Sequence, residues 1–168
     1  AQIENITADN ARLVSNLHAN LGGLYRMNGH PDLAREHMEK SISLLDQFNL
    51  LHINDSIPQI ANYAMFLTEQ QEPERGISEL QKLSGIIKEY HSDDCLDYAK
   101  VQETLGTIYL MTANLPQAKT HFKKAFKIYE KIWADEPEMI EAKYQEIQEL
   151  YPQIGFFIGK NLSGLLTK

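Results

Sequence analysis

The sequence predicts an all-α protein made of repeated antiparallel helix pairs, and three observations lead to this prediction. The stretch at residues 21–34 (LGGLYRMNGHPDLA) returns at residues 105–118 (LGTIYLMTANLPQA), a shift of 84 residues. Half of that shift, 42 residues, also relates Tyr25 to Leu67. Apolar residues recur at helical spacing on both sides of short breakers that contain proline. A constant period of this kind is typical of helical repeat proteins, in which each helix pair stacks on the next.

The first repeat spans about residues 9–50 and contains two predicted helices, 9–28 and 31–49. Four leucines recur at helical spacing in the first of them, namely Leu13, Leu17, Leu21 and Leu24. Pro31 suits the first turn of the second helix, where its missing N–H leaves no bond unmade. Asp9 is expected to mark a helix start, because a carboxylate there accepts hydrogen bonds from free N–H groups. Asp93 and Asp135 occupy the same position in the 42-residue period.

The second and third repeats follow the same plan over about residues 51–92 and 93–134. The predicted helices are 56–71 and 73–91 in the second repeat, then 94–113 and 116–134 in the third. In each case a proline follows the short breaker between the two helices, as Pro73 and Pro116.

Small residues recur at one position on each helix of the pair. They are Gly22, Ala64 and Gly106 on the first helices, and Ala34, Gly76 and Ala118 on the second helices. We expect two antiparallel backbones to approach closely there, with larger neighbours such as Met38 and Phe122 filling the surrounding space.

We expect residues 135–168 to form a degenerate fourth unit or cap, with predicted helices at 136–151 and near 156–167. The apolar residues of the last segment are Phe157, Ile158, Leu162, Leu165 and Leu166. Two interpretations remain open. This C-terminal apolar helix caps the third repeat, or it forms the interface of a homodimer.

Composition and charge exclude several classes of function. The 168 residues carry a net charge of −7, which argues against nucleic-acid binding by this chain. No segment reaches the roughly 18 apolar residues that a transmembrane helix needs, and no membrane partner is expected. The single cysteine, Cys95, cannot form an internal disulfide, which predicts a reducing, cytoplasmic location.

The sequence contains no pattern that predicts catalysis, a cofactor or a metal site. His91 and Cys95 have a spacing that could reach one ion, but a structural site needs about four ligands and no second pair accompanies them. We therefore interpret Cys95 as a buried or half-buried thiol. His37 and His121 occupy the same position in the 42-residue period, and we interpret both as surface residues of their repeats. No phosphate-binding loop or nucleophile motif is present, so the protein is not expected to be an enzyme.

The third repeat, with Leu105, Gly106, Tyr109, Ala118 and Phe122, resembles the tetratricopeptide repeat pattern. The first repeat resembles it nearly as well, and the second more loosely. The 42-residue period is similar to the repeats of kinesin light chains. This resemblance implies a single domain that forms a right-handed α-α superhelix of three antiparallel helix pairs plus a C-terminal degenerate pair or cap. It also implies a concave groove that binds a peptide or partner-protein segment, without catalysis.

The resemblance places the groove on the first helix of each pair. The candidate binding residues are Asn16, Asn20, Gly23, Arg26, Met27, Asn62, Met65, Glu69, Lys100, Thr104, Thr107 and Met111. The asparagine amides can donate to and accept from an extended peptide backbone, and the methionines offer adaptable apolar surface. Only Asn62 and Lys100 match the clamp with which some family members hold acidic chaperone tails, so binding of such tails is not expected.

Two other classes of function remain open. The chain could be the peptide-sensing receptor domain of a larger bacterial regulator, which would need a DNA-binding part outside this sequence. It could instead be a structural unit for homo-oligomerisation that uses helix ends and the C-terminal apolar helix.

Overall fold

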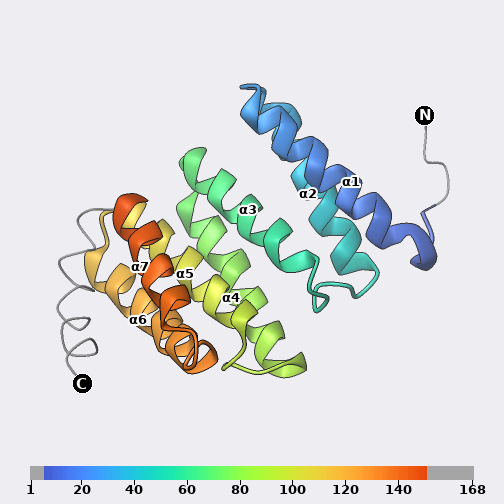
Figure 1. The fold of residues 1–168 in the computed structure, drawn as a ribbon. Helices are drawn as coiled ribbons and strands as arrows, with labels where there is room; N and C mark the ends of the chain where they lie inside the picture. Colours follow the sequence, from blue (N-terminus) through green and yellow to red (C-terminus); the bar gives the residue numbers. More distant parts are fainter. Residues whose placement is uncertain (1–5, 151–168) are drawn as a thin grey trace, which may run out of the picture. The chain divides into compact units, whose positions relative to one another are not determined.

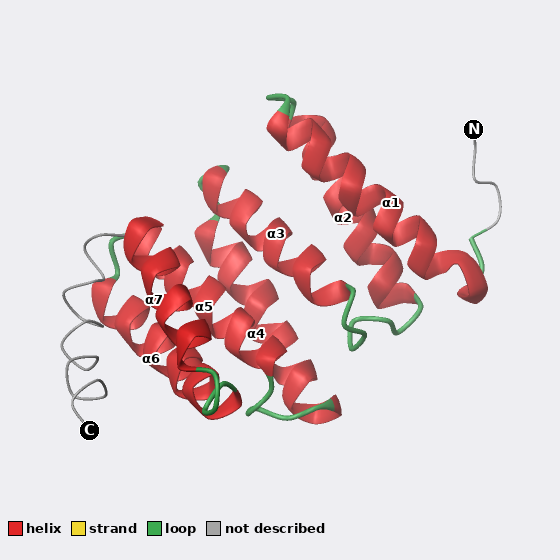
Figure 2. Cartoon of the chain, viewed as in Figure 1, coloured by secondary structure: helices red, strands yellow, loops and turns green. Residues whose placement is uncertain are grey.

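The computed structural model describes residues 6–150, and every regular element in that range is an α-helix. The helices are α1 (Ala8–Met27), α2 (Pro31–Gln47), α3 (Ser56–Glu69), α4 (Pro73–Tyr90), α5 (Leu96–Met111), α6 (Leu115–Ile132) and α7 (Pro137–Leu150) (Figures 1 and 2). Each of these helices begins and ends within two residues of its predicted bounds. The all-α class is therefore confirmed, and the expected helix at 156–167 lies outside the described residues.

The chain divides into two compact units, residues 1–92 and 93–168. The division falls at the predicted boundary between the second and third repeats. Unit 1 contains the antiparallel pairs α1–α2 and α3–α4, with α3 also in contact with α1 and α2. Unit 2 contains the pair α5–α6 with α7 against α6.

The small repeat positions of unit 1 lie where paired helices approach each other closely, as expected. A Cβ atom added to Gly76 would lie 2.6 Å from the carbonyl oxygen of Ala64. A Cβ atom added to Gly22 would lie 3.2 Å from the carbonyl oxygen of Ala34 and 2.6 Å from Cγ of Met38. These glycines therefore set how closely the two helices of each pair pack.

Helix α1 buries small residues and exposes large ones. Its buried residues are Ala11, Val14, Ser15 and Gly22, which pack toward the rest of unit 1. By contrast, Leu13, Leu17 and Leu24 are 72%, 47% and 55% exposed. The leucine spacing thus predicted the helix correctly, but these three leucines face away from the core.

A cluster of charged side chains joins the two helix pairs of unit 1. Arg35 on α2 donates to Glu72 at 2.5 Å, and Arg75 on α4 lies 3.4 Å from Glu39 of α2. The hydroxyl of Tyr63 on α3 donates to the same Glu39 carboxylate at 2.9 Å. Burial, and then the Glu39 carboxylate that accepts this bond, raise the pKa of Tyr63. The cluster therefore connects α2, α3 and α4.

In unit 2, buried aromatic residues and one lysine hold α7 against the α5–α6 pair. Phe126 stacks on Tyr144 of α7 at a centroid distance of 4.0 Å. Lys143 of α7 lies 3.0 Å from Glu103 of α5, and the Tyr129 hydroxyl donates to Glu103 at 2.6 Å. Burial of Tyr129 and the nearby Glu103 carboxylate raise the pKa of its hydroxyl.

The histidines that share a phase are half-buried rather than free surface positions. His37 stacks on Tyr25 at 5.3 Å, and His121 stacks on Tyr109 at 5.2 Å, so the same ring pair recurs 84 residues apart. The Nδ1 atom of His121 is 2.9 Å from Oε1 of Gln102. In the first repeat His18 replaces that glutamine, and its Nδ1 atom is 2.7 Å from Nδ1 of His37.

Each of the three helix pairs turns through one residue with positive φ at the same repeat position. These residues are Gly29 (φ 74°), Gln71 (φ 66°) and Ala113 (φ 59°). After each of them, the next N–H donates to a carbonyl near the end of the first helix; His30 N, for example, bonds to the Tyr25 carbonyl at 2.9 Å. Only the first repeat has glycine at this position, so the other two hold a strained residue there.

Helix starts are set by residues other than the recurring aspartates. Thr7 precedes α1, and its backbone N–H donates to the Asn10 side chain at 2.8 Å. Half-buried Cys95 precedes α5, and its sulfur accepts from the Tyr98 N–H at 3.4 Å. Asp9 lies within the first turn of α1, while Asp93 lies before the start of α5.

Among the described helices, none has the length and apolar content to cross a bilayer.

Candidate functional site

A cavity of about 460 Å³ opens in unit 1 between α1 and α3, with α2 contributing to its lining. It is built from Asn16, Ala19, Asn20, Gly23, Arg26 and Met27 of α1, Met38 and Ser41 of α2, and Asp55, Pro58, Gln59 and Asn62 at or in α3. Its volume lies within the usual range for ligand pockets, which is roughly 300–1,000 Å³.

The α1 wall of the cavity is open because its central residues are small. Ala19 and Gly23 lie one helical turn apart on α1. A Cβ atom added to Gly23 would meet no atom within 4 Å, unlike one added to the neighbouring Gly22. Gly22 therefore serves helix packing, whereas Gly23 leaves space in the cavity.

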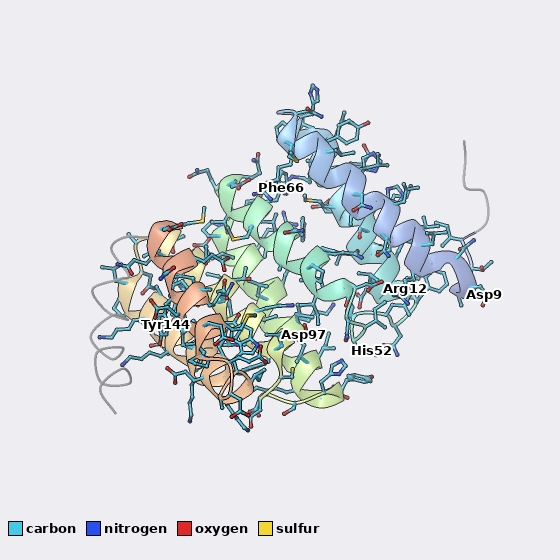
Figure 3. All side chains as sticks on the ribbon, in the orientation of Figure 1. Asp9, Arg12, His52, Phe66, Asp97 and Tyr144 are labelled. Carbon is cyan, nitrogen blue, oxygen red and sulfur yellow. The ribbon has the colours of Figure 1, made fainter. Side chains whose placement is uncertain are left out.

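Two ion pairs between α1 and α3 flank the cavity, and both join residues 43 apart in the chain. Arg12 donates from Nε to Asp55 at 2.7 Å, at the end of α1 nearest the loop before α3 (Figure 3). Arg26 donates from Nε to Glu69 at 2.8 Å, and a second nitrogen of its guanidinium reaches the other carboxylate oxygen. The hydrogen bond from Arg12 is the main cause that holds the pKa of Asp55 below its usual value.

A polar network fixes the lining between α1, α2 and α3. Oε1 of Gln59 accepts from the hydroxyls of Ser15 at 2.9 Å and Ser41 at 2.6 Å. Its amide nitrogen donates to Oδ1 of Asn16 at 2.5 Å. Ser15 and Ser41 are almost completely buried, so an unmade bond here would be costly. The orientation of Asn16 in the cavity is thus determined by the network.

Asn20 and Asn62 present exposed amides to the cavity from its two walls. They occupy the same repeat position, 42 residues apart, on α1 and α3. Within residues 6–150, neither side chain makes a hydrogen bond. Each amide keeps its donors and acceptor available for a ligand.

The structure places only part of the predicted set of binding residues at this cavity. Asn16, Asn20, Gly23, Arg26, Met27 and Asn62 line it. Met65 is half-buried on α3 and is not in the lining, and Glu69 contributes through its pair with Arg26.

The remaining four predicted residues belong to α5 of unit 2. Lys100 lies 3.9 Å from Asp97 on its own helix, and the Thr104 hydroxyl donates to the Lys100 carbonyl at 2.9 Å. Thr107 is half-buried, and Met111 is 45% exposed at the end of α5.

The sequence-based prediction missed several lining residues, and the 42-residue period could have identified one of them. Pro58 occupies the repeat position of Asn16, 42 residues later, and could have been included on that basis. Gln59, Ser41 and Met38 had no such signal, because none of them shares a repeat position with a predicted residue, and Ser41 and Met38 lie on a second helix, α2.

Three comparisons with known proteins bear on this fold. Residues 56–131 match a family model described as tetratricopeptide repeat. Among solved structures, the chain is similar to BtubC (BKLC) from P. vanneervenii, with a TM-score of 0.66 and 18% sequence identity. That match covers 77% of this chain and 50% of BtubC, so the chain spans about half the length of that protein. No curated protein matches the sequence.

Proposed function

We propose that the protein is a non-enzymatic binding module whose α1–α3 cavity holds an extended segment of a partner polypeptide. The tetratricopeptide-repeat match over residues 56–131 and the similarity to BtubC support this class of function. Tetratricopeptide repeats generally mediate protein–protein interaction, which supports the class of function. We also propose that it acts in the cytoplasm, where its single cysteine stays reduced.

The observation that carries the proposal is the pair of exposed amides, Asn20 and Asn62. An extended peptide offers alternating N–H and C=O groups, and an asparagine amide can bond to one of each. Two such amides on facing walls would hold the peptide backbone without selecting its side chains. The network around Gln59 supports this role, because a lining already ordered in the free protein loses little entropy when it binds.

The charges at the cavity predict which peptides bind. Arg12 and Arg26 are already engaged by Asp55 and Glu69, so a ligand carboxylate would have to compete with these pairs. Apolar surface is available from Met27, which is 85% exposed, together with other lining residues. We therefore expect neutral segments with small or apolar side chains to bind better than acidic ones.

A selection from a random peptide library, followed by calorimetry with the selected peptides, tests the proposal. The double variant Asn20→Ala, Asn62→Ala should weaken binding roughly tenfold or more, since each lost hydrogen bond is worth about 1 kcal/mol. In NMR spectra, the amide signals that move on peptide addition should belong to α1 and α3.

The matched control removes two exposed amides away from the cavity, as Gln47→Ala, Gln81→Ala. This variant should bind as the unaltered protein does. Peptide affinity that is equal in the asparagine variant and the control, or signal changes confined to other helices, would show that the α1–α3 cavity is not the binding site.

A further inference from the structure

One face of α1 carries a stripe of uncharged, mostly apolar residues, and two of its members, Asn20 and Met27, also line the α1–α3 cavity. The stripe consists of Asn10, Leu13, Leu17, Asn20, Leu24 and Met27, and we call it the α1 stripe. Leu13, Leu17 and Leu24 are 72%, 47% and 55% exposed, and Met27 is 85% exposed. Grouped exposure of this kind is uncommon on monomeric soluble proteins and indicates an interaction surface.

The spacing of the α1 stripe is that of a coiled-coil seam. Its residues follow one another at intervals of three, four, three, four and three, which is the a/d pattern of a heptad repeat. The buried residues of the same helix, Ala11, Val14, Ser15 and Gly22, lie on another face. Helix α1 can therefore pack against a second helix without leaving its place in unit 1.

The partner surface must also be a helical stripe without charges. The α1 stripe contains no charged residue, whereas the chain as a whole carries a net charge of −7. The nearby Arg12 and Arg26 are engaged by carboxylates of unit 1. A charged partner helix would lose hydration against this face without gaining an ion pair, while a copy of the same face brings no like charges together.

Among residues 6–149, no other single helix carries a stripe of large exposed apolar side chains on one face. The remaining ones are Leu33, Tyr90, Met111, Leu115, Ile132 and Met139. On the part of the surface that the structure describes, the face that fits the α1 stripe is therefore the α1 stripe of another copy.

We propose that the protein forms a two-fold homodimer in which α1 packs antiparallel against α1 of a second copy. In this register Leu13 faces Leu24 of the partner subunit, and Leu17 faces Asn20 of the partner subunit. The intervals between stripe residues are the same in both chain directions, so two antiparallel copies of the stripe can pack against each other. A two-fold interface requires such a self-complementary surface. The proposal does not depend on peptide binding, and its tests use the protein without peptide.

The first test is the oligomeric state of the full chain by sedimentation equilibrium. The expected mass is twice 19.2 kDa, and Leu17→Glu should shift it to 19.2 kDa. Leu33→Glu is the matched control, because Leu33 is a similarly exposed leucine, 41%, that stands outside the stripe. Circular dichroism checks that each variant folds, and Leu13→Glu, at a more exposed position, repeats the test if Leu17→Glu does not.

The second test fixes the partner helix by cross-linking in a Cys95→Ser background. Under oxidation, a mixture of the Leu13→Cys and Leu24→Cys proteins should form a disulfide-linked dimer. Each protein alone should not, because like positions in the antiparallel register lie about 16 Å apart along the helix axis.

Other occupants of the stripe give distinct results. A chain that stays monomeric, or a dimer that Leu17→Glu leaves intact, overturns the proposal. A dimer that survives these substitutions would instead fit an interface through the apolar residues of 156–167. Linkage of Leu13→Cys with itself would indicate a parallel pair and would also overturn the antiparallel register.

Discussion

The closest helix contact of unit 1 gives the sharpest stability prediction. In Gly76→Ala, the new Cβ atom on α4 would lie 2.6 Å from the carbonyl oxygen of Ala64 on α3, whereas real contacts essentially never fall below 3.0 Å. That oxygen belongs to the backbone, so relief requires the helices themselves to separate. We expect overpacking to cost about 3 kcal/mol, the upper end of the usual range. Better helix propensity returns about 1 kcal/mol, which leaves a net loss of about 2 kcal/mol.

Gly85→Ala on the same helix is the matched control. Its added Cβ atom would meet nothing within 4 Å, so only the propensity gain of about 1 kcal/mol remains. The two variants should therefore differ by about 3 kcal/mol in unfolding free energy, in opposite directions from the unaltered protein. Urea unfolding followed by circular dichroism measures this difference, while fluorescence of the single tryptophan, Trp133, reports unit 2 separately. If Gly76→Ala proved as stable as Gly85→Ala, the close α3–α4 approach would be refuted.

Three further predictions concern buried polar groups and turns. Burial, and secondarily Lys124, lowers the pKa of His121 from 6.5 to about 4, so stability should be complete above pH 6.5 and fall by up to about 3 kcal/mol toward pH 4. His121→Gln should flatten that fall in pH-dependent urea titrations. Ser41→Ala removes a buried donor to Gln59 and should reduce the unfolding free energy by about 1–2 kcal/mol, as measured by urea denaturation. Ala113→Gly relieves a positive φ and should raise the thermal midpoint, whereas Ala113→Val should lower it.

The sequence period predicted the helices well because it depends on local chemistry. Proline after a short breaker and apolar residues at helical spacing fix where a helix begins and how long it runs, and both are readable in each repeat. The small residues also predicted the pairing of helices, since Gly22 and Gly76 do lie against the neighbouring helix. The close approach at Gly106 is different in kind, because an added Cβ atom there would meet the Phe122 ring.

The sequence could not show which face of α1 is buried. Hydrophobicity favours the leucines, but the neighbouring helices approach so closely that only small residues such as Ala11, Ser15 and Gly22 fit between them. This limit on side-chain size comes from the packing of α1 against other helices. The spacing of apolar residues along the sequence therefore cannot predict it. The cavity residues Ser41 and Gln59 were missed for another tertiary reason, because their place in the lining depends on a hydrogen bond between two helices, α2 and α3.

Helix α1 shows why residues that return every 84 positions and residues that change are both informative. Gly22 returns as Gly106 because a larger side chain would meet a neighbouring side chain in either repeat, whereas Gly23, which becomes Thr107, borders the open cavity. Met27 returns as Met111, yet it is 85% exposed and supports no packing. It borders the cavity and also ends the α1 stripe, where two proposed interactions would meet. Because one side chain cannot serve a peptide and a second α1 at full strength, peptide binding and dimerisation should weaken each other, and Met27→Ala should reduce that coupling.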